Sequence, residues 1–217
     1  MKTVVLIPIK LGSKRVPGKN IKPFFDGTPL IHFIQKTCLN AKNVDEIYVY
    51  CSDEVIKDYL LPGVKFLKRP EYLNGDNINA NDIIREFMKV VDADIYVNAH
   101  TTSPFAKIET IEECIDKVSS GEYDSAFCAE AIRTFMWENG KPINFDPDHF
   151  PRTQDLPLIY GETSIAYVFT KESFIKNNRR LGVKPYIKEV DKIEAMDIDY
   201  PEDFEICNAI YREVIKK

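Results

Sequence analysis

Short apolar runs rich in β-branched residues alternate with amphipathic helical patterns from the start of the chain. The runs predict strands over Thr3–Ile9, Glu46–Cys51, Val64–Leu67, Asp94–Asn98 and Ser125–Ala129. Between them, apolar residues recur at helical spacing. Because each apolar strand is followed by a helix, the pattern indicates parallel strands with helices on both faces. It therefore predicts an α/β fold with a doubly wound, mostly parallel sheet.

The pattern breaks over residues 133–160, which contain one tryptophan, one glycine and four prolines. No helical period survives there, so we expect a small arm or hairpin that protrudes from the main sheet. Regularity returns with predicted strands over Ser164–Thr170 and Lys184–Val190, and a last helix follows Pro201. Because no repeat or linker divides the chain, residues 1–217 are expected to form a single domain with an inserted arm.

The composition excludes some classes of partner. The chain has 29 basic and 34 acidic residues, a net charge of −5, whereas a nucleic-acid binder needs a basic surface. No apolar run approaches the roughly 20 residues that span a bilayer. The five cysteines are widely spread and include no CxxC pair, which is typical of reduced thiols. We therefore expect a cytoplasmic protein with neither nucleic-acid nor membrane partners.

A strongly basic loop follows the first predicted strand. Residues 10–22 carry five positive charges and no acidic side chain. In open parallel sheets, ligands bind beyond the carboxyl ends of the strands, where this loop is expected to lie. Glycine backbone and cationic side chains together suit several phosphate oxygens. The candidate nucleotide-binding residues of the loop are Lys10, Gly12, Ser13, Lys14, Lys19 and Asn20.

The basic loop is not a Walker A motif. The spacing from Gly12 to Gly18 is one residue too long, and Asn20 stands where Ser or Thr would bind magnesium. The loop also lacks the GxGxxG fingerprint. A solvated turn is the alternative interpretation, but the position between a strand and a helix favours a phosphate cradle of a different kind.

Two aspartates lie just before the last predicted helix. Side chains alternate along an extended segment, so Asp197 and Asp199 are expected on the same side. Close carboxylates repel each other, and a divalent cation such as Mg²⁺ relieves this repulsion. Mg²⁺ prefers one or two carboxylates together with phosphate oxygens as its ligands. The alternative is that both residues only favour the dipole of the helix start. Taken with the basic loop, the pair predicts phosphoryl or nucleotidyl transfer.

Five segments in this order resemble the cytidylyltransferases that make CMP-activated acidic sugars, a family that includes the CMP-N-acetylneuraminate synthetases. The segments are Pro8–Asn20, Tyr50–Asp53, Arg69–Leu73, Thr102–Pro104 and Asp197–Asp199. The resemblance covers nearly the whole chain. It implies a Rossmann-like nucleotidyltransferase fold and a reaction in which CTP and a keto-sugar acid give a CMP-sugar and pyrophosphate.

The resemblance also implies roles for individual residues. It assigns the triphosphate to the basic loop, the selection of cytosine to Arg69, and magnesium to Asp197 and Asp199. Lys19 and the two aspartates are the implied catalytic residues. The arm is implied to build a homodimer and to reach into the neighbour's sugar pocket. The implied partners are therefore CTP, a small acidic sugar and a second copy of the chain.

The chain departs from the family pattern mainly in its acceptor half. His100 replaces a glutamine, and Gly161–Ser164 replaces an arginine and an Asn-Gly pair, while in the nucleotide loop Lys10 replaces the usual arginine. The departures favour a nonulosonate other than N-acetylneuraminate. Glu162 would disfavour a carboxylate unless the acceptor carries an amine or the side chain points away. The candidate acceptor-binding residues are His100, Ser103, Arg152, Thr163 and Tyr167.

Two alternative functions stay open at this point. Glycosyltransferases that use nucleotide sugars also carry a DxD motif, although usually nearer the middle of the chain. A catalytically inactive nucleotide-binding subunit would share the basic loop. Pyrophosphate as the product, rather than a free nucleoside diphosphate, separates the predicted enzyme from the first alternative, and turnover separates it from the second.

Overall fold

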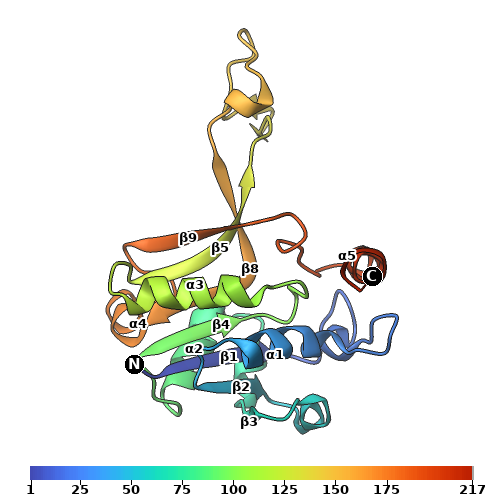
Figure 1. Cartoon of the computed structure of the whole chain (residues 1–217), viewed down its shortest axis with the longest axis vertical. Helices are drawn as coiled ribbons and strands as arrows, with labels where there is room; N and C mark the ends of the chain where they lie inside the picture. Colours follow the sequence, from blue (N-terminus) through green and yellow to red (C-terminus); the bar gives the residue numbers. More distant parts are fainter. Residues whose placement is uncertain (217) are drawn as a thin grey trace.

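A seven-stranded sheet forms the centre of the protein (Figure 1), as seen in a computed structural model that describes residues 1–216. The strand order is β3-β2-β1-β4-β8-β5-β9. Six strands run parallel, and β8 is antiparallel to both of its neighbours. The strands are β1 (Thr3–Ile9), β2 (Glu46–Cys51), β3 (Val64–Lys68), β4 (Ile95–Ala99), β5 (Ser125–Ile132), β8 (Ile159–Thr170) and β9 (Pro185–Val190). The predicted mostly parallel α/β architecture is confirmed.

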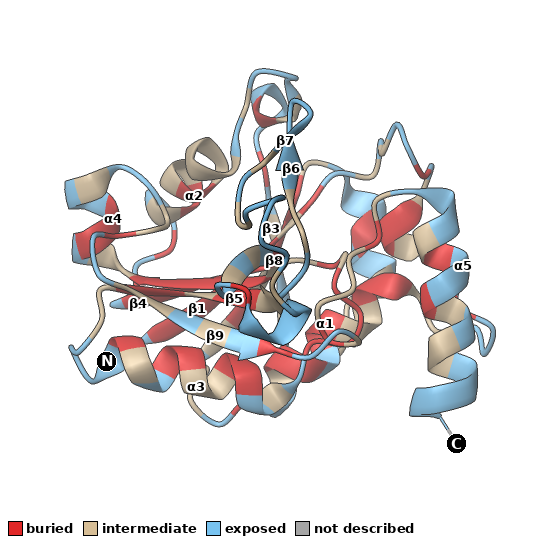
Figure 2. Cartoon of the chain, turned by 90° about the horizontal axis from the view of Figure 1, so that it is seen from above, coloured by how far each residue is buried: buried red, intermediate tan, exposed pale blue. Residues whose placement is uncertain are grey.

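Helices cover both faces of the sheet (Figure 2). One face carries α1 (Leu30–Asn40) and α3 (Ile108–Ser119), and the other carries α2 (Ala80–Met88) and α4 (Lys171–Asn177). The remaining helical segments are α5 (Pro201–Ile210), the 3-10 turns Lys19–Ile21, Glu54–Tyr59, Glu71–Asn74 and Thr153–Asp155, and a π turn over Tyr211–Ile215. Within residues 1–216, no helix is both long and apolar enough to cross a membrane.

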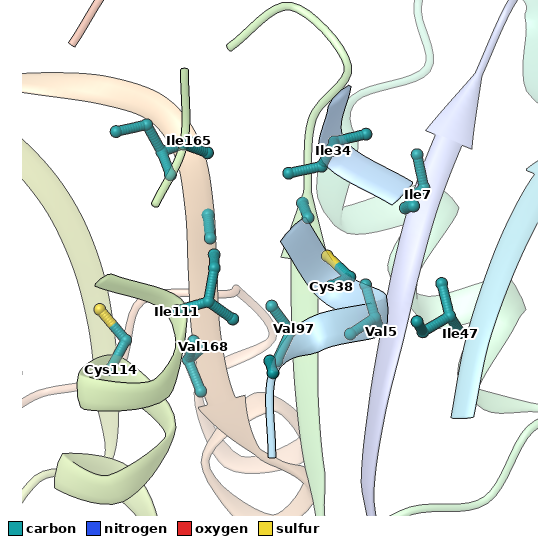
Figure 3. Packing of buried hydrophobic residues seen from close by; sticks show 14 of the residues in the cluster. Val5, Ile7, Ile34, Cys38, Ile47, Val97, Ile111, Cys114, Ile165 and Val168 are labelled. Carbon is teal, nitrogen blue, oxygen red and sulfur yellow. The ribbon is translucent and has the colours of Figure 1, made fainter. Parts of the chain in front are cut away.

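The larger core lies between the sheet and the helices α1 and α3 (Figure 3). Ile34 and Cys38 of α1 and Ile111 of α3 pack on Val5 and Val97 of the central strands. These apolar runs are buried because helices cover both sides of the parallel strands. The opposite face has a smaller, aromatic core, whose largest members are Tyr50, Phe87, Tyr96 and Phe169.

Removing the Ile34 side chain is expected to destabilise the protein by about 2–5 kcal/mol, because the fully buried residue would leave a cavity. Urea unfolding of Ile34→Ala measures the change in unfolding free energy. Ile206→Ala, at an exposed position of α5, is the matched control and is expected to change stability by less than about 0.5 kcal/mol. Equal effects of the two substitutions would contradict this account of the core.

The structure differs from the sequence prediction at β8. This strand begins at Ile159 rather than Ser164, and it is the one strand of the sheet, within the described residues, that runs antiparallel to its neighbours, a direction that the sequence pattern did not predict. Its first residues pair with the end of β5 at the base of the arm, as in Ile132 with Ile159. They are largely not buried, which explains why no apolar run marks them.

The arm projects from the end of the β5–β8 ladder, away from the sheet (Figure 1). Its hairpin pairs β6 (Trp137–Glu138) with β7 (Lys141–Pro142). Asn139 and Gly140, which join the two strands, both have positive φ, the combination that tight hairpin turns favour. Four aromatic rings contact one another beside the hairpin, those of Phe135, Trp137, Phe145 and Phe150.

All five cysteines are buried and unpaired. Burial raises the pKa of Cys38 and of Cys207 to about 12. Thiols with such a pKa carry almost no nucleophilic thiolate at neutral pH. The cysteines therefore act as small apolar side chains of the core.

Candidate functional site

The basic loop is tied to the carboxyl end of β4 by one buried side chain. The amide of Asn20 donates to the carbonyl of Lys10 at 3.1 Å and accepts from the Thr101 hydroxyl at 2.5 Å. Gly18, with φ of 65°, has the left-handed conformation that starts the turn over Lys19–Ile21. These bonds place the loop at the edge of the sheet where parallel strands end.

The basic loop meets the acidic segment, although about 180 residues separate them in the chain. Lys19 is 8% exposed, and its ammonium donates to the Ile198 carbonyl at 2.5 Å and lies 3.6 Å from the Asp199 carboxylate. Arg15 binds both oxygens of Asp199, at 2.7 and 3.0 Å. The predicted juxtaposition of the loop with the aspartate pair is confirmed.

Local packing fixes the acidic segment in this place. Ile198 is fully buried against Phe204 of α5, and its N–H donates to the Thr102 carbonyl at 2.9 Å. The Asp203 carboxylate accepts from the N–H groups of Asp199 and Tyr200, at 2.9 and 2.7 Å, and so caps α5. The segment is thus anchored by Ile198, which holds the two flanking aspartates next to the basic loop.

Asp197 is the member of the aspartate pair with a raised pKa. Burial raises the pKa of its carboxyl group, and the Asp199 carboxylate raises it further, while a bond to Thr102 opposes both. The buried Oδ1 atom of Asp197 has no hydrogen-bond partner. An orphaned carboxylate oxygen beside a second carboxylate fits a divalent cation. Within residues 1–216, no cluster of three or more metal-ligating side chains occurs, so further ligands would have to come from a substrate.

A second buried cation lies on the β2–β3 side of the loop. Arg69 is 2% exposed and donates to the Asn74 side chain at 2.5 Å, while its Nε atom has no partner. Asn74 in turn donates to the Ser52 hydroxyl at 2.8 Å, and its carbonyl accepts from Lys10 at 2.5 Å. Arg69 is thus held at the sheet edge next to the basic loop with donor capacity left over.

The predicted acceptor residues His100 and Tyr167 face each other across β4 and β8. Their rings meet edge to face, with centroids 6.0 Å apart, and the His100 ring also lies 2.9 Å from the Asn98 amide. Burial, assisted by the charge of Arg180, lowers the pKa of His100 to about 4. The imidazole is therefore neutral at pH 7 and can offer a hydrogen bond without adding charge.

Three other predicted acceptor residues have different surroundings. Arg152 lies on the arm, where its guanidinium pairs with Asp155 at 2.7 Å. The Thr163 hydroxyl donates to the Cys128 carbonyl at 3.0 Å. Ser103 is fully buried, and its hydroxyl has no partner. Of the three, only Ser103 retains unused hydrogen-bonding capacity beside β4.

The exposed part of the basic loop is only loosely held. Lys14 pairs with Asp76 at 3.2 Å, and both side chains are largely exposed. The Ser13 hydroxyl accepts from the Val16 N–H at 3.4 Å. Gly12 lacks the positive φ seen at Gly18 and has open space around it. These residues are free to rearrange around a ligand, whereas Lys19 and Asn20 are already fixed.

Comparison with known proteins decides the family. A family model described as "Cytidylyltransferase" matches residues 4–215. The chain belongs to the cytidylyltransferase family. The resemblance inferred from the sequence motifs is therefore confirmed.

Individual members of the cytidylyltransferase family are distant relatives of this chain. The N-acylneuraminate cytidylyltransferase of Streptococcus agalactiae is 25% identical over 94% of the chain, which spans about half (52%) of that relative's length. The pseudaminic acid cytidylyltransferase of Campylobacter jejuni is 24% identical over 98% of the chain and 97% of its own length. A CMP:2-keto-3-deoxy-manno-octonic acid synthetase, solved with CTP, shares the fold with a TM-score of 0.71 at 18% identity, covering 98% of this chain and 99% of its own.

Two arginines of the candidate site were missed by sequence reasoning. Arg15 lies in the basic loop, and its bond to Asp199 follows from the charge complementarity of the loop and the acidic segment. That complementarity could have identified it. Arg180 comes from the segment between α4 and β9 and stacks on Tyr167. No motif or spacing marks it, because its contact with Tyr167 joins a connecting segment to β8.

Proposed function

We propose that this protein transfers CMP from CTP to a small acidic keto-sugar and releases pyrophosphate. The observation that carries the proposal is the contact of Lys19 and Arg15 with the Asp197–Asp199 segment at the carboxyl edge of the sheet. The likeness to enzymes named for N-acylneuraminate and pseudaminic acid supports an acidic keto-sugar as the acceptor. The low identity to both leaves the particular sugar to experiment.

In the proposed reaction, an acceptor hydroxyl attacks the α-phosphorus of CTP. The new bond joins that oxygen to phosphorus, the bond to pyrophosphate breaks, and the hydroxyl proton passes to a base. Lys10, Lys19, Asn20 and the loosely held residues Gly12–Lys14 hold the triphosphate, and fixed positive charge stabilises the leaving pyrophosphate. Arg69 offers its spare donor to the cytosine. The acceptor lies against His100 and Tyr167.

The orphaned oxygen of Asp197 makes this residue, with Asp199, the candidate holder of Mg²⁺. When bound, the magnesium ion would neutralise phosphate charge near the α-phosphorus. Asp199 must first release Arg15, which binds both of its oxygens. We expect the triphosphate to draw Arg15 away, because phosphate oxygens compete for the guanidinium.

A pyrophosphate-release assay that crosses four nucleoside triphosphates with a panel of keto-sugar acids tests the proposal. Release is expected only with CTP, an acceptor and Mg²⁺ together. A nucleoside diphosphate as product from a CDP- or UDP-sugar would instead support a glycosyltransferase. Tight CTP binding with no turnover across the panel would support an inactive nucleotide-binding subunit.

We also propose that the arm forms a homodimer. Trp137 is 57% exposed and Phe150 is 64% exposed, and both belong to the four-ring aromatic cluster of the arm. Aromatic residues that protrude on an arm are typical of protein interfaces. In a dimer, the arm's Arg152 would be free to reach the partner's acceptor pocket.

Replacing Trp137 and Phe150 together with glutamate is expected to convert the dimer into a monomer, because two charges would have to be desolvated at the contact. Light scattering coupled to size-exclusion chromatography measures the mass in solution. Ile175→Glu, at an exposed site on α4, is the control and is expected to stay dimeric. A monomeric wild type, or a dimeric double variant, would contradict an arm-mediated dimer.

A further inference from the structure

Arg180 returns over β8 from the segment that follows α4 and presents an unsatisfied guanidinium. Its Cζ atom lies 3.3 Å from the centroid of the Tyr167 ring. Burial lowers the pKa of Arg180, although an arginine remains charged at neutral pH. Among residues 1–216, the guanidinium makes no hydrogen bond, and its one ion-pair contact is Glu162, at 3.7 Å from Nη2. Five donors are therefore held in place without an acceptor.

Glu162 of β8 contacts both Arg180 and Tyr167, and these three side chains form one group with His100. Its side chain is about half exposed, and its Oε1 accepts the hydrogen bond of the Tyr167 hydroxyl. The Oε2 atom of Glu162 makes no hydrogen bond within the described chain. The surrounding ring groups carry no charge at pH 7, because burial raises the pKa of Tyr167 and lowers that of His100 to about 4. The charges of Arg180 and Glu162 thus balance each other.

The group adjoins the site proposed for the nucleotide. His100, which touches Tyr167, directly precedes Thr101 and Thr102 in the chain. Thr101 holds Asn20 of the basic loop, and Thr102 holds the acidic segment through Ile198. A molecule seated on Arg180 and Tyr167 would therefore lie beside the phosphates that the loop is proposed to bind. That position suits the acceptor rather than the nucleotide.

The charge balance restricts what the acceptor can place there. A carboxylate on Arg180 would lie close to Glu162, and the two negative charges would repel each other. Neighbouring uncharged groups of a sugar fit better, since one oxygen can accept from the guanidinium while the next hydroxyl or amide N–H donates to Glu162. We propose that Arg180 and Glu162 select the acceptor by its vicinal hydroxyl or acylamido groups, not by its carboxylate.

This inference rests on the proposed function, and it resolves how Glu162 can line a pocket for an acidic sugar. The acid group of the acceptor would then bind elsewhere, against the basic loop or a partner's Arg152. Arg180 balances the negative charge of Glu162, and the Glu162 carboxylate accepts a hydrogen bond from the sugar. If Arg180 and Glu162 bind uncharged sugar groups, removing the negative charge at position 162 should weaken acceptor binding. If Arg180 instead binds the carboxylate of the acceptor, the same change should strengthen it.

The decisive variants are Glu162→Gln and Arg180→Met. Each is expected to lower kcat/KM for the acceptor by about 10- to 100-fold, since each removes a charge-assisted hydrogen bond. The KM for CTP is expected to stay within about twofold of the wild-type value, because neither residue is placed at the nucleotide. Arg180→Lys keeps the charge but loses the planar fork, and is expected to recover activity only in part.

Controls guard against a purely structural effect. Glu122→Gln, at an exposed site in the turn before β5, is expected to match the wild type in every assay. Thermal unfolding of each variant checks the fold. If Glu162→Gln instead raises kcat/KM for the sugar acid, Arg180 binds the carboxylate and the inference is overturned. If Glu162→Gln and Arg180→Met both leave the acceptor KM and kcat unchanged, it is overturned as well.

Direct binding separates this inference from the proposed function. Calorimetry would use N-acetylneuraminate, pseudaminic acid and 2-keto-3-deoxy-manno-octonic acid as probes, with and without CTP. If the wild type releases no pyrophosphate yet binds a probe, and both variants weaken that binding about tenfold or more, the reaction assignment fails while the subsite stands. If the wild type binds none of the three probes, the subsite is refuted. If pyrophosphate is released but the variants bind normally, only the subsite is refuted.

Discussion

Replacing Asp199 with asparagine is expected to reduce Mg²⁺-dependent pyrophosphate release by roughly 10²- to 10³-fold and to leave the fold intact. The carboxylate is partly exposed and receives Arg15 and Lys19, so its negative charge serves the site rather than the core. Exposed ion pairs add little to stability, and the neighbouring Ile198 provides the buried anchor. The assay compares initial rates over a magnesium titration, and calorimetry measures magnesium binding in the presence of CTP.

The matched control is Glu202→Gln, three residues further along at an exposed position on α5. It removes one carboxylate from the same segment without touching the site, and is expected to keep wild-type turnover. Asp197→Asn is expected to resemble Asp199→Asn in its loss of magnesium dependence. Unchanged turnover in Asp199→Asn, or an equal loss in Glu202→Gln, would refute the assignment of the metal to this pair.

The general position of the site followed from the sequence because two physical rules combine there. Apolar runs covered by helices predict parallel strands, and ligands of such sheets lie beyond the carboxyl ends of the strands. The basic loop after β1 was therefore expected at that edge. The Asp197–Asp199 pair was linked to this loop through the magnesium and phosphate chemistry that the two would share, and the bonds of Lys19 and Arg15 show that the two segments are in contact.

The acceptor side was harder to predict, because its geometry depends on one antiparallel strand. Hydrophobic patterns reveal that a segment is a strand, but they do not reveal its direction. The direction of β8 places Tyr167 opposite Asn98 and brings Arg180 above it. A lone arginine between a helix and a strand has no periodic signal, so its partners emerge only from tertiary structure.

The same limit explains why Glu162 seemed unfavourable in the sequence. Its neutralising partner is 18 positions away and belongs to another element. The sum of charges near a site, rather than any one residue, decides which ligand it accepts. The candidate nucleotide residues come mainly from one loop, which a sequence motif can mark, whereas the candidate acceptor residues are side chains of three separate elements.

Replacing Lys19 with methionine is expected to lower kcat/KM for CTP by roughly 10²- to 10³-fold. Lys19 is the buried cation of the basic loop, and its ammonium is already oriented by the Ile198 carbonyl at 2.5 Å and by Asp199 at 3.6 Å. A fixed charge in a poorly solvated place interacts more strongly with phosphate than a mobile, exposed one. Initial rates at varied CTP, with acceptor and magnesium saturating, measure the loss.

Lys22→Met provides the comparison within the same loop. The Lys22 ammonium lies over the Phe204 ring at 3.9 Å and 3.5 Å from Glu205, so it is already used away from the proposed phosphates. This variant removes the same charge from the loop but is expected to change kcat/KM for CTP by less than about threefold. Only a long-range attraction to the phosphates would be lost, and salt screens that attraction. If both lysine variants lose activity equally, the net charge of the loop matters rather than the oriented ammonium. The proposed role of Lys19 would then be wrong, because its contacts with the acidic segment would serve only to hold the loop in place.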